Sequence, residues 1–245
     1  MKITVIGAGA IGGNLARRLS LAGHDVLVAD ARGPGAVTAE VLKAGARAVA
    51  LDASVQGRDA VILAIPFGVQ GQLADLFAAV PAETVVIDTS NYYPHLSGRI
   101  EPVEDGGQVE SVYTSDLLGR PVVKAWNAAL AETQRTRGVP AGTPGRIAIP
   151  VAGDSAEAKK VAMSLVDDTG FDPYDAGVLA DSWRQQPMGP AYCTELTIDE
   201  LPAALTAADR VKDAAVRDSM MERFAALPDN PTLDDVVEMN RAAHR

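Results

Sequence analysis

A glycine pattern near the start of the chain, GAGAIG, has the G-x-G-x-x-G spacing that binds the pyrophosphate of a dinucleotide. Its first glycine permits a tight turn, its second lets the backbone approach the pyrophosphate, and its third lets helix and strand pack closely. The apolar run ITVI precedes the pattern and a helical pattern follows it, so free N–H groups of a helix N-terminus would face the phosphates. This context disfavours a glycine-rich turn that only packs. We expect a nicotinamide dinucleotide to bind at Gly7, Ala8, Gly9, Ala10, Ile11 and Gly12.

An acidic residue, Asp30, ends the next predicted strand, 18 residues after Gly12. A carboxylate at this place accepts hydrogen bonds from both ribose hydroxyls and repels a 2′-phosphate, which favours NAD. Arg32 could instead lie over the adenine or pair with a 2′-phosphate, since a guanidinium stacks on rings and binds phosphate. It could also be a solvated loop charge. We expect Asp30, Ala31 and Arg32 to contact the adenosine half, with NAD favoured and NADP left open.

Two further stretches, AIPFG and DTSNYYP, follow predicted strands at the edge where open α/β sheets bind their ligands. The turn formed by Ala64, Ile65 and Pro66 would lie beside the nicotinamide, with backbone groups and apolar side chains against the ring. Asn91 could donate or accept hydrogen bonds in the same cleft. The two tyrosines that follow Asn91 are better explained as packing of a loop.

The stretch VKAWN ends another predicted strand. We expect Ala125, Trp126 and Asn127 to line the cofactor or a planar substrate. Two simpler interpretations stay open, because Lys124 could form an ion pair at the strand end and Trp126 could belong to the core.

No residue stands out as a proton donor. Of the three histidines, His24 precedes a strand, His244 is next to the last residue, and His95 is most simply a solvated loop residue. Cys193 is better explained by packing than as a nucleophile, no Ser/His/Asp set is present, and no His/Cys cluster has the spacing of a metal site. The catalytic residues therefore stay unknown, with Lys124 and Asn127 as candidates. Such a site suits hydride transfer between two ring cofactors better than reduction of a ketone, which needs a positioned acid.

The elements that must position these residues alternate between strand and helix from Met1 to about Tyr174. Continuous apolar runs predict strands at ITVIG, VLVAD, RAVAL, AVILAIP, TVVIDT, PVVKAW, RIAIPVAG and DPYD. The first helix has Leu15 and Leu19 on one face and Gly23 at its end. This alternation predicts an α/β fold, a Rossmann-type doubly wound parallel sheet. The stretch RGVPAGTPGR, residues 137–146, should be a surface loop.

After residue 175 the pattern becomes helical. We expect residues 1–175 to form an NAD(P)-binding Rossmann domain and residues 176–245 a small helical region that covers the substrate or mediates dimerisation. The stretch TIDELPAALTAADRVKDAAVRDSMMERFAAL predicts one long helix with Pro202 in its first turn. Thr232 and Asp235 have the spacing of a capping box that begins a second helix.

Composition restricts the class of partner. The 245 residues are 47% hydrophobic, which is ample for a core, and the formal net charge of −10 argues against a nucleic-acid or anionic membrane surface. The apolar start of the chain is too short for a signal peptide, and no run of about 18 apolar residues predicts a membrane span. One cysteine excludes an intrachain disulfide and fits a reducing compartment. We expect a cytoplasmic protein with small-molecule partners and no bound metal.

Four stretches carry a family resemblance: MKITVIGAGAIGGNLARRLSLAGHDVLVADARGP, VIDTSNYYP, VVKAWNAALAET and SWRQQPMGPAYC. They resemble the NADPH-dependent F420 reductase family, the F420-dependent NADP oxidoreductases, whose nucleotide domain is similar to that of the STEAP ferric reductases. The similarity runs along nearly the whole chain and is strongest over residues 1–130. It implies a Rossmann domain with a small helical part, a homodimer, and hydride transfer between NADP(H) and the deazaflavin coenzyme F420.

The chain departs from this family at the predicted ribose site. Relatives often have Asn-Ser where this chain has Asp30-Ala31, so the hydroxyl that would help to bind a 2′-phosphate is missing. The anionic tail of F420 would need local cations, for which Arg99, Arg120 and Lys124 are the candidates.

Two other functions stay open. One is reduction of a small carbonyl or imine, as in β-hydroxyacid dehydrogenases, although in that family the lysine and asparagine are four residues apart on a helix. Here Lys124 and Asn127 are three apart at a strand end. The other is a non-catalytic regulatory protein that binds NAD(P).

Overall fold

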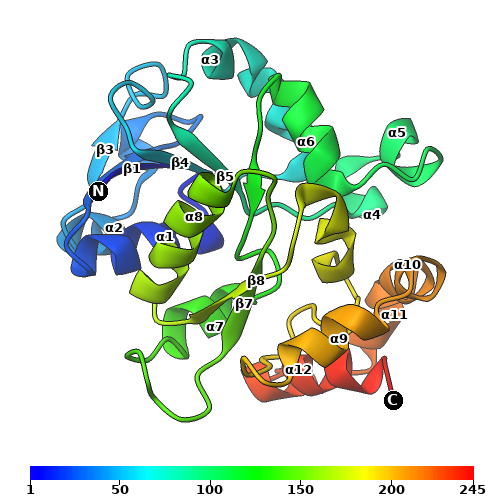
Figure 1. The fold of residues 1–245 in the computed structure, drawn as a ribbon. Coiled ribbons are helices and arrows are strands. Elements are labelled where there is room, and N and C mark those ends of the chain that lie inside the picture. The colour runs from blue at the N-terminus through cyan, green and yellow to red at the C-terminus, as the bar shows by residue number, and fades with distance from the viewer.

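A parallel sheet of six strands forms the centre of the computed structural model, which describes residues 1–245 (Figure 1). Its order is β3-β2-β1-β4-β5-β6, so β2 and β3 lie on one side of β1 and the later strands lie on the other side. A Rossmann sheet binds its ligand at this switch point, between β1 and β4. The Rossmann-type fold is therefore confirmed. The strands are β1 (Lys2–Ile6), β2 (Asp25–Ala29), β3 (Arg47–Val49), β4 (Ala60–Leu63), β5 (Val85–Asp88) and β6 (Val123–Lys124).

The last two predicted strands exist but do not extend this sheet. β7 (Ala148–Val151) and β8 (Asp172–Asp175) pair in parallel as a separate sheet of two strands. Ala152, directly after β7, forms a single antiparallel backbone bridge with Lys124 at the end of β6. β7 therefore meets the main sheet at this one bridge and does not continue it as a seventh parallel strand. The predicted loop 137–146 precedes β7 and contains no helix or strand.

Helices cover both faces of the sheet. On one face, α1 (Ala10–Leu21) and α8 (Ala156–Asp168) share a core of 23 buried residues with the strands. Leu15 and Leu19 of α1 are fully buried, and Gly23 follows the helix with φ of 91°, as predicted. The other face packs 11 buried residues beneath η2 (Phe67–Leu73), α3 (Ala74–Ala78) and α6 (Glu110–Leu118). The remaining short helices up to β7 are η1 (Pro34–Ala36), α2 (Ala39–Lys43), α4 (Pro94–Ser97), α5 (Glu101–Glu104) and α7 (Ala131–Thr136).

The C-terminal region consists of five short helices, and the last four lie together beside the C-terminus in Figure 1. They are η3 (Leu179–Gln185), α9 (Leu201–Ala207), α10 (Arg210–Asp218), α11 (Met220–Ala225) and α12 (Leu233–Ala242). Pro202 lies in the first turn of α9, and Thr232 and Asp235 form the predicted capping box.

The prediction of one long helix before α12 is wrong, because α9, α10 and α11 replace it. Ala208 is extended, with ψ of 138°, and the Asp209 carboxylate accepts hydrogen bonds from the N–H groups of Val211 and Lys212. An aspartate that caps in this way begins a new helix. The helical periodicity of the sequence does not reveal this break.

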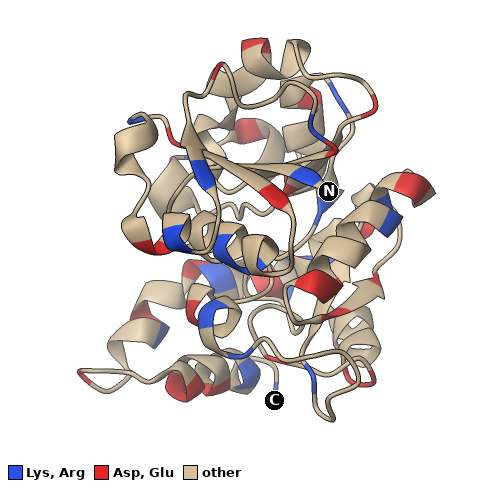
Figure 2. Cartoon of the chain, turned by 90° about the vertical axis from the view of Figure 1, so that its left-hand side faces the viewer, with Lys and Arg blue, Asp and Glu red and all other residues tan.

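Charged residues of both signs are interspersed over the side of the molecule drawn in Figure 2. No helix has the combined length and apolar character needed to cross a membrane.

Candidate functional site

The glycine loop between β1 and α1 has the shape that its sequence predicts. A Cβ atom on Gly7, where φ is 105°, would lie 2.2 Å from the carbonyl oxygen of Ala64, and one on Gly12 would lie 1.9 Å from that of Gly7. Only glycine fits at these two positions. A Cβ atom on Gly9 would meet no protein atom within 4 Å. The chain therefore leaves space for a ligand at the N-terminus of α1.

A pocket of about 260 Å³ opens beside this loop, with Ala8, Gly9 and Ala10 in its wall. Arg17 of α1 and Arg135 of α7 also line it. Arg17 Nε is buried without a hydrogen-bond partner. The Arg135 guanidinium donates to both carboxylate oxygens of Glu132, from Nη2 at 2.6 Å and from Nε at 2.8 Å. A guanidinium beside a helix N-terminus is well suited to bind phosphate. The sequence alone indicates neither arginine, because the docking of α7 on α1 has no local signal.

Asp30 is 8% exposed and lies directly after β2. Its carboxylate accepts hydrogen bonds from the N–H of Ala8 in the glycine loop, at 3.2 Å, and from the N–H and guanidinium of Arg32, at 2.8 to 3.1 Å. The hydrogen bonds from Arg32 hold the pKa of Asp30 well below its usual range. Ala31 and Arg32 are exposed. Arg32 thus occupies carboxylate oxygens that ribose hydroxyls would use.

The structure brings two predicted cleft residues, Asn91 and Asn127, into direct contact. Asn127 Nδ2 donates to Asn91 Oδ1 at 3.0 Å, and Asn91 Nδ2 donates to the carbonyl oxygen of Asn127 at 3.0 Å. Gln185 of η3 binds the Asn127 amide from the C-terminal region, at 2.7 and 3.0 Å. Ala64, Ile65 and Pro66 follow β4, with Ala64 and Ile65 half-buried and Pro66 exposed.

A pair of tyrosines that the sequence did not indicate lies against this amide network. The hydroxyl oxygens of Tyr93 and Tyr192 are 2.6 Å apart, and Asn91 Nδ2 lies 3.4 Å from Tyr192 Oη. Burial raises the pKa of both hydroxyls, so both stay protonated. One hydrogen lies between the two oxygens, and the pair keeps a second O–H hydrogen that this bond does not use. The expectation that Tyr93 only packs a loop is incomplete.

The segment that carries Tyr192 has an unusual backbone. Met188 and Cys193, on either side of it, have positive φ values of 64° and 54°. Non-glycine residues rarely adopt this conformation, and it often accompanies functional sites. Burial raises the pKa of the Cys193 thiol to about 12, which agrees with packing rather than nucleophilic attack.

The candidate Lys124 is fully buried and already partnered. Its Nζ lies 3.0 Å from the Asp88 carboxylate and donates to the carbonyl oxygen of Ser90 at 2.5 Å. The ion-pair alternative is therefore the one that the structure contains. Ala125 is also fully buried. The Trp126 ring lies in the core and donates to Thr169 Oγ1 at 3.1 Å, so it does not line a substrate.

The other cations proposed for an anionic tail are also engaged. Arg120 donates to backbone carbonyl oxygens of the segment that precedes β5, at the opposite edge of the sheet, and Arg99 pairs with Asp105. His24 pairs with Asp168, and His95 is exposed on α4. The His95 ring lies against Tyr93 of the tyrosine pair, with 5.6 Å between the ring centroids.

Comparison with known proteins gives both a family and structural relatives. Residues 2–92 match the model of a family described as NADP oxidoreductase, coenzyme F420-dependent. The Escherichia coli strain K12 protein YjhV is 40% identical over 104 residues, which are 42% of this chain and 76% of YjhV.

Two solved structures are similar over most of the chain. The Sinorhizobium meliloti protein SMa0349 superposes with a TM-score of 0.70 and 29% identity, over 80% of this chain and 95% of that one. A candidate F420-dependent NADP-reductase from Arthrobacter sp. FB24 superposes with a TM-score of 0.58 and 25% identity, over 74% and 87% of the two chains. The family match spans the glycine loop, Asp30 and Asn91.

Proposed function

Since the chain belongs to the coenzyme F420-dependent NADP oxidoreductase family, we propose that it transfers hydride between a nicotinamide dinucleotide and coenzyme F420. The coarser activity, that of an NAD(P)-dependent oxidoreductase, follows from the family. The observation that carries the proposal is the free space over Gly9, between an N-terminal helix end and the Asp30 carboxylate. The residues present fit a dinucleotide.

We assign the cofactor contacts by region. The backbone of the glycine loop and Arg17 would hold the pyrophosphate, and Asp30, Ala31 and Arg32 the adenosine ribose. The turn at Ile65 would lie against the nicotinamide, where a bound cofactor supplies or accepts a hydride. The wider set adds Ala64, Pro66, Asn91, Ala125, Trp126 and Asn127, of which the buried Ala125 and Trp126 would act through their backbone.

The chain's own contribution to hydride transfer is positioning. Asn91, Asn127 and Gln185 form one hydrogen-bonded network that joins the ends of β5 and β6 to the C-terminal region. If the nicotinamide and F420 rings are held against this network, hydride passes directly from one ring to the other and no protein group is oxidised or reduced. Holding the two rings in the right orientation by itself lowers the activation barrier of hydride transfer substantially. Residues 1–175 would then be the dinucleotide-binding domain, with residues 176–245 as the cover.

Either dinucleotide fits the ribose site. With Arg32 on the carboxylate, part of the negative charge of Asp30 is already neutralised, which weakens its repulsion of a 2′-phosphate. Released from Asp30, the exposed guanidinium could pair with that phosphate. We propose that the site accepts NADP as well as NAD, and that movement of Arg32 selects between them.

A second function, reduction of a small carbonyl or imine, is favoured by the tyrosine pair. Such a reduction needs a proton as well as a hydride, and the Tyr93–Tyr192 pair holds an O–H hydrogen beside Asn91. Tyr192→Phe would then reduce turnover strongly while leaving dinucleotide affinity unchanged.

One experiment separates these functions. The purified chain is titrated with NADH and NADPH by nicotinamide fluorescence, and hydride transfer is then followed by absorbance with F420, or with a panel of small ketones and cyclic imines. Transfer to F420 supports the first function. Oxidation of the nicotinamide by a ketone or imine alone supports the second. Tight binding without any turnover would replace both with a regulatory role.

A further inference from the structure

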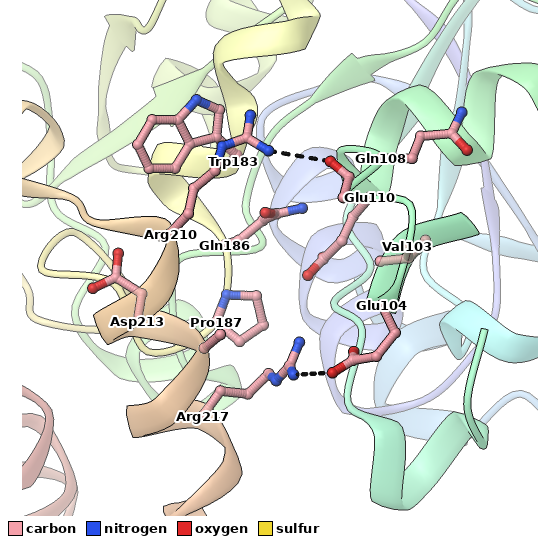
Figure 3. Close-up of a pocket in the computed structure, with 12 residues that line it drawn as sticks. Val103, Glu104, Gln108, Glu110, Trp183, Gln186, Pro187, Arg210, Asp213 and Arg217 are labelled. Carbon is pink, nitrogen blue, oxygen red and sulfur yellow. Dashed lines mark hydrogen bonds and ion pairs between the residues drawn. The ribbon is translucent and has the colours of Figure 1, made fainter. Parts of the chain in front are cut away.

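A second cavity, of about 190 Å³, lies outside the glycine-loop pocket (Figure 3). One wall comes from α5 and the start of α6, and the other from α10 and the segment after η3. Arg210, Asp213, Ala214 and Arg217 line it. Their spacing of three and four residues places them on one face of α10, so the cavity is a feature of how α10 docks.

Two arginines of α10 close the ends of the cavity. Arg210 donates to the carbonyl oxygen of Gly107 at 3.1 Å and lies over the Trp183 ring, 4.7 Å from its centroid. Arg217 pairs with Glu104 at 2.9 Å. Both guanidinium groups are therefore used for docking, as the dashed lines in Figure 3 show.

Glu110 is the buried acid of this cavity, with 3% of its surface exposed. Its Oε2 accepts the N–H of Tyr92 at 3.1 Å and lies 4.0 Å from Lys124 Nζ, which is closer to Asp88, at 3.0 Å. No protein group donates to the other oxygen, Oε1, and Figure 3 shows the side chain directed into the cavity. A carboxylate oxygen that faces a cavity and has no protein donor is free to accept a hydrogen bond from a ligand.

A second oxygen in the same wall lacks a donor. Glu104 uses Oε1 for Arg217, whereas its Oε2 is buried without a partner. The charged side chains that line the cavity are three acids, Glu104, Glu110 and Asp213, and two arginines. The acids outnumber the arginines, and the atoms without a donor are carboxylate oxygens of Glu104 and Glu110. An ionised carboxylate accepts hydrogen bonds and cannot donate them. The missing group is a cation with N–H donors.

We propose that this cavity binds a small organic amine in its protonated form. The ammonium group donates to Glu110 Oε1, the carboxylates of Glu104 and Asp213 add negative charge to the lining, and the hydrocarbon part packs against Val103, Pro187 and Ala214. A cavity of about 190 Å³ has room for a compact organic molecule rather than a single water. The site is separate from the glycine-loop pocket, so it does not depend on whether F420 is the hydride acceptor.

The test uses Trp183 as a fluorescent reporter of the whole chain. The chain has two tryptophans, and the other, Trp126, is fully buried in the core away from this cavity. Cyclohexylammonium is titrated at pH 8, above the pKa of about 7 of Glu110, so that this carboxylate is ionised. The ionic strength is kept constant, and cyclohexanol and cyclohexanecarboxylate are the neutral and anionic analogues. We expect a saturable change with the cation alone, and loss of that change in Trp183→Phe.

Matched variants assign the site. Glu110→Gln keeps the shape and removes the charge, and should weaken cyclohexylammonium binding at least tenfold, with Glu104→Gln weakening it less. Glu101→Gln, an exposed acid on α5 outside the cavity, should bind as the unaltered chain does. Far-UV circular dichroism checks that each variant folds. The proposal is overturned if the cation gives no saturable change, if cyclohexanol or the carboxylate binds equally well, or if folded Glu110→Gln keeps full affinity.

Discussion

At the residue scale, the choice of dinucleotide depends on Asp30 and Arg32. Removing the carboxylate in Asp30→Ser takes away the group that repels a 2′-phosphate and leaves Arg32 free to pair with it. We expect the preference to shift towards NADPH by about 1 to 3 kcal/mol. Affinities for NADH and NADPH, measured by nicotinamide fluorescence, give this ratio.

Two control variants accompany the measurement of the NADH-to-NADPH affinity ratio. Asp52→Ser removes an exposed acid elsewhere and should leave the ratio unchanged. Arg32→Ala should move the ratio the opposite way, because it exposes the Asp30 carboxylate. An unaltered ratio in Asp30→Ser would mean that this carboxylate does not face the 2′ position.

Gly9 tests whether the open space at the loop is the cofactor site. The backbone at Gly9 has φ of −71°, which any residue adopts, and an added Cβ meets no protein atom. Gly9→Val should therefore keep its melting temperature while losing at least tenfold in dinucleotide affinity. Gly12→Ala is the contrast, because its Cβ would collide with the backbone of Gly7 and lower the melting temperature. Normal NADH and NADPH binding by Gly9→Val would place the cofactor elsewhere.

Glu110 makes stability depend on pH. Burial raises the pKa of Glu110 to about 7 from the usual 4.5, and the negative charge of Asp88 adds to this rise. The positive charges of Lys124 and Arg217 lower the pKa, but by less than burial raises it. Folding therefore favours the protonated form, and this contribution is lost as pH rises from about 4.5 through 7. The loss is on the order of 3 kcal/mol.

Urea unfolding at pH 5 and pH 8 measures this effect. The neutral amide of Glu110→Gln cannot ionise, so the variant should gain stability relative to the unaltered chain at pH 8 but not at pH 5. An equal stability difference at both pH values would show that Glu110 has an ordinary pKa.

At the element scale, α1 contributes a side chain to the dinucleotide site in addition to the N–H groups at its N-terminus. Arg17 lies farther along this helix and lines the glycine-loop pocket. Its Nη2 donates to the carbonyl oxygen of Arg135 at 3.4 Å, so α7 helps to hold it in place. Arg17→Gln should weaken binding of both dinucleotides about equally, by roughly 1 kcal/mol or more, because a charge-assisted bond to phosphate is lost. Arg47→Gln, which affects an exposed arginine paired with Asp25, is the control. Unchanged affinity in Arg17→Gln would exclude it from the phosphate site.

At the scale of the whole molecule, the proposed homodimer has a candidate surface on the C-terminal helices. Val211 of α10 and Met221 and Phe224 of α11 are 80%, 61% and 40% exposed. Large apolar side chains on neighbouring helices often mark an interface. Light scattering after gel filtration should give twice the chain mass of 25.5 kDa. Phe224→Glu combined with Met221→Glu should give the single mass, and a monomeric unaltered chain would contradict the proposal.

The sequence by itself determined the features that local rules govern. The alternation of apolar runs gave all eight strands, and the turn requirements of glycine gave the loop at Gly7 and Gly12. The end of α1 at Gly23 and the cap at Thr232 followed in the same way. These features depend on neighbours a few residues away, whose spacing is visible in the chain.

Only the tertiary structure decided which distant side chains meet. Tyr93 and Tyr192 are 99 residues apart, and Glu110 and Arg217 face one cavity only because α10 docks on α5. It also buried Lys124 and Trp126, for which the sequence left a place in the cleft and a buried position both open. Burial and pairing of this kind are set by packing between elements, and the free energy of that packing depends on contacts that no local pattern records.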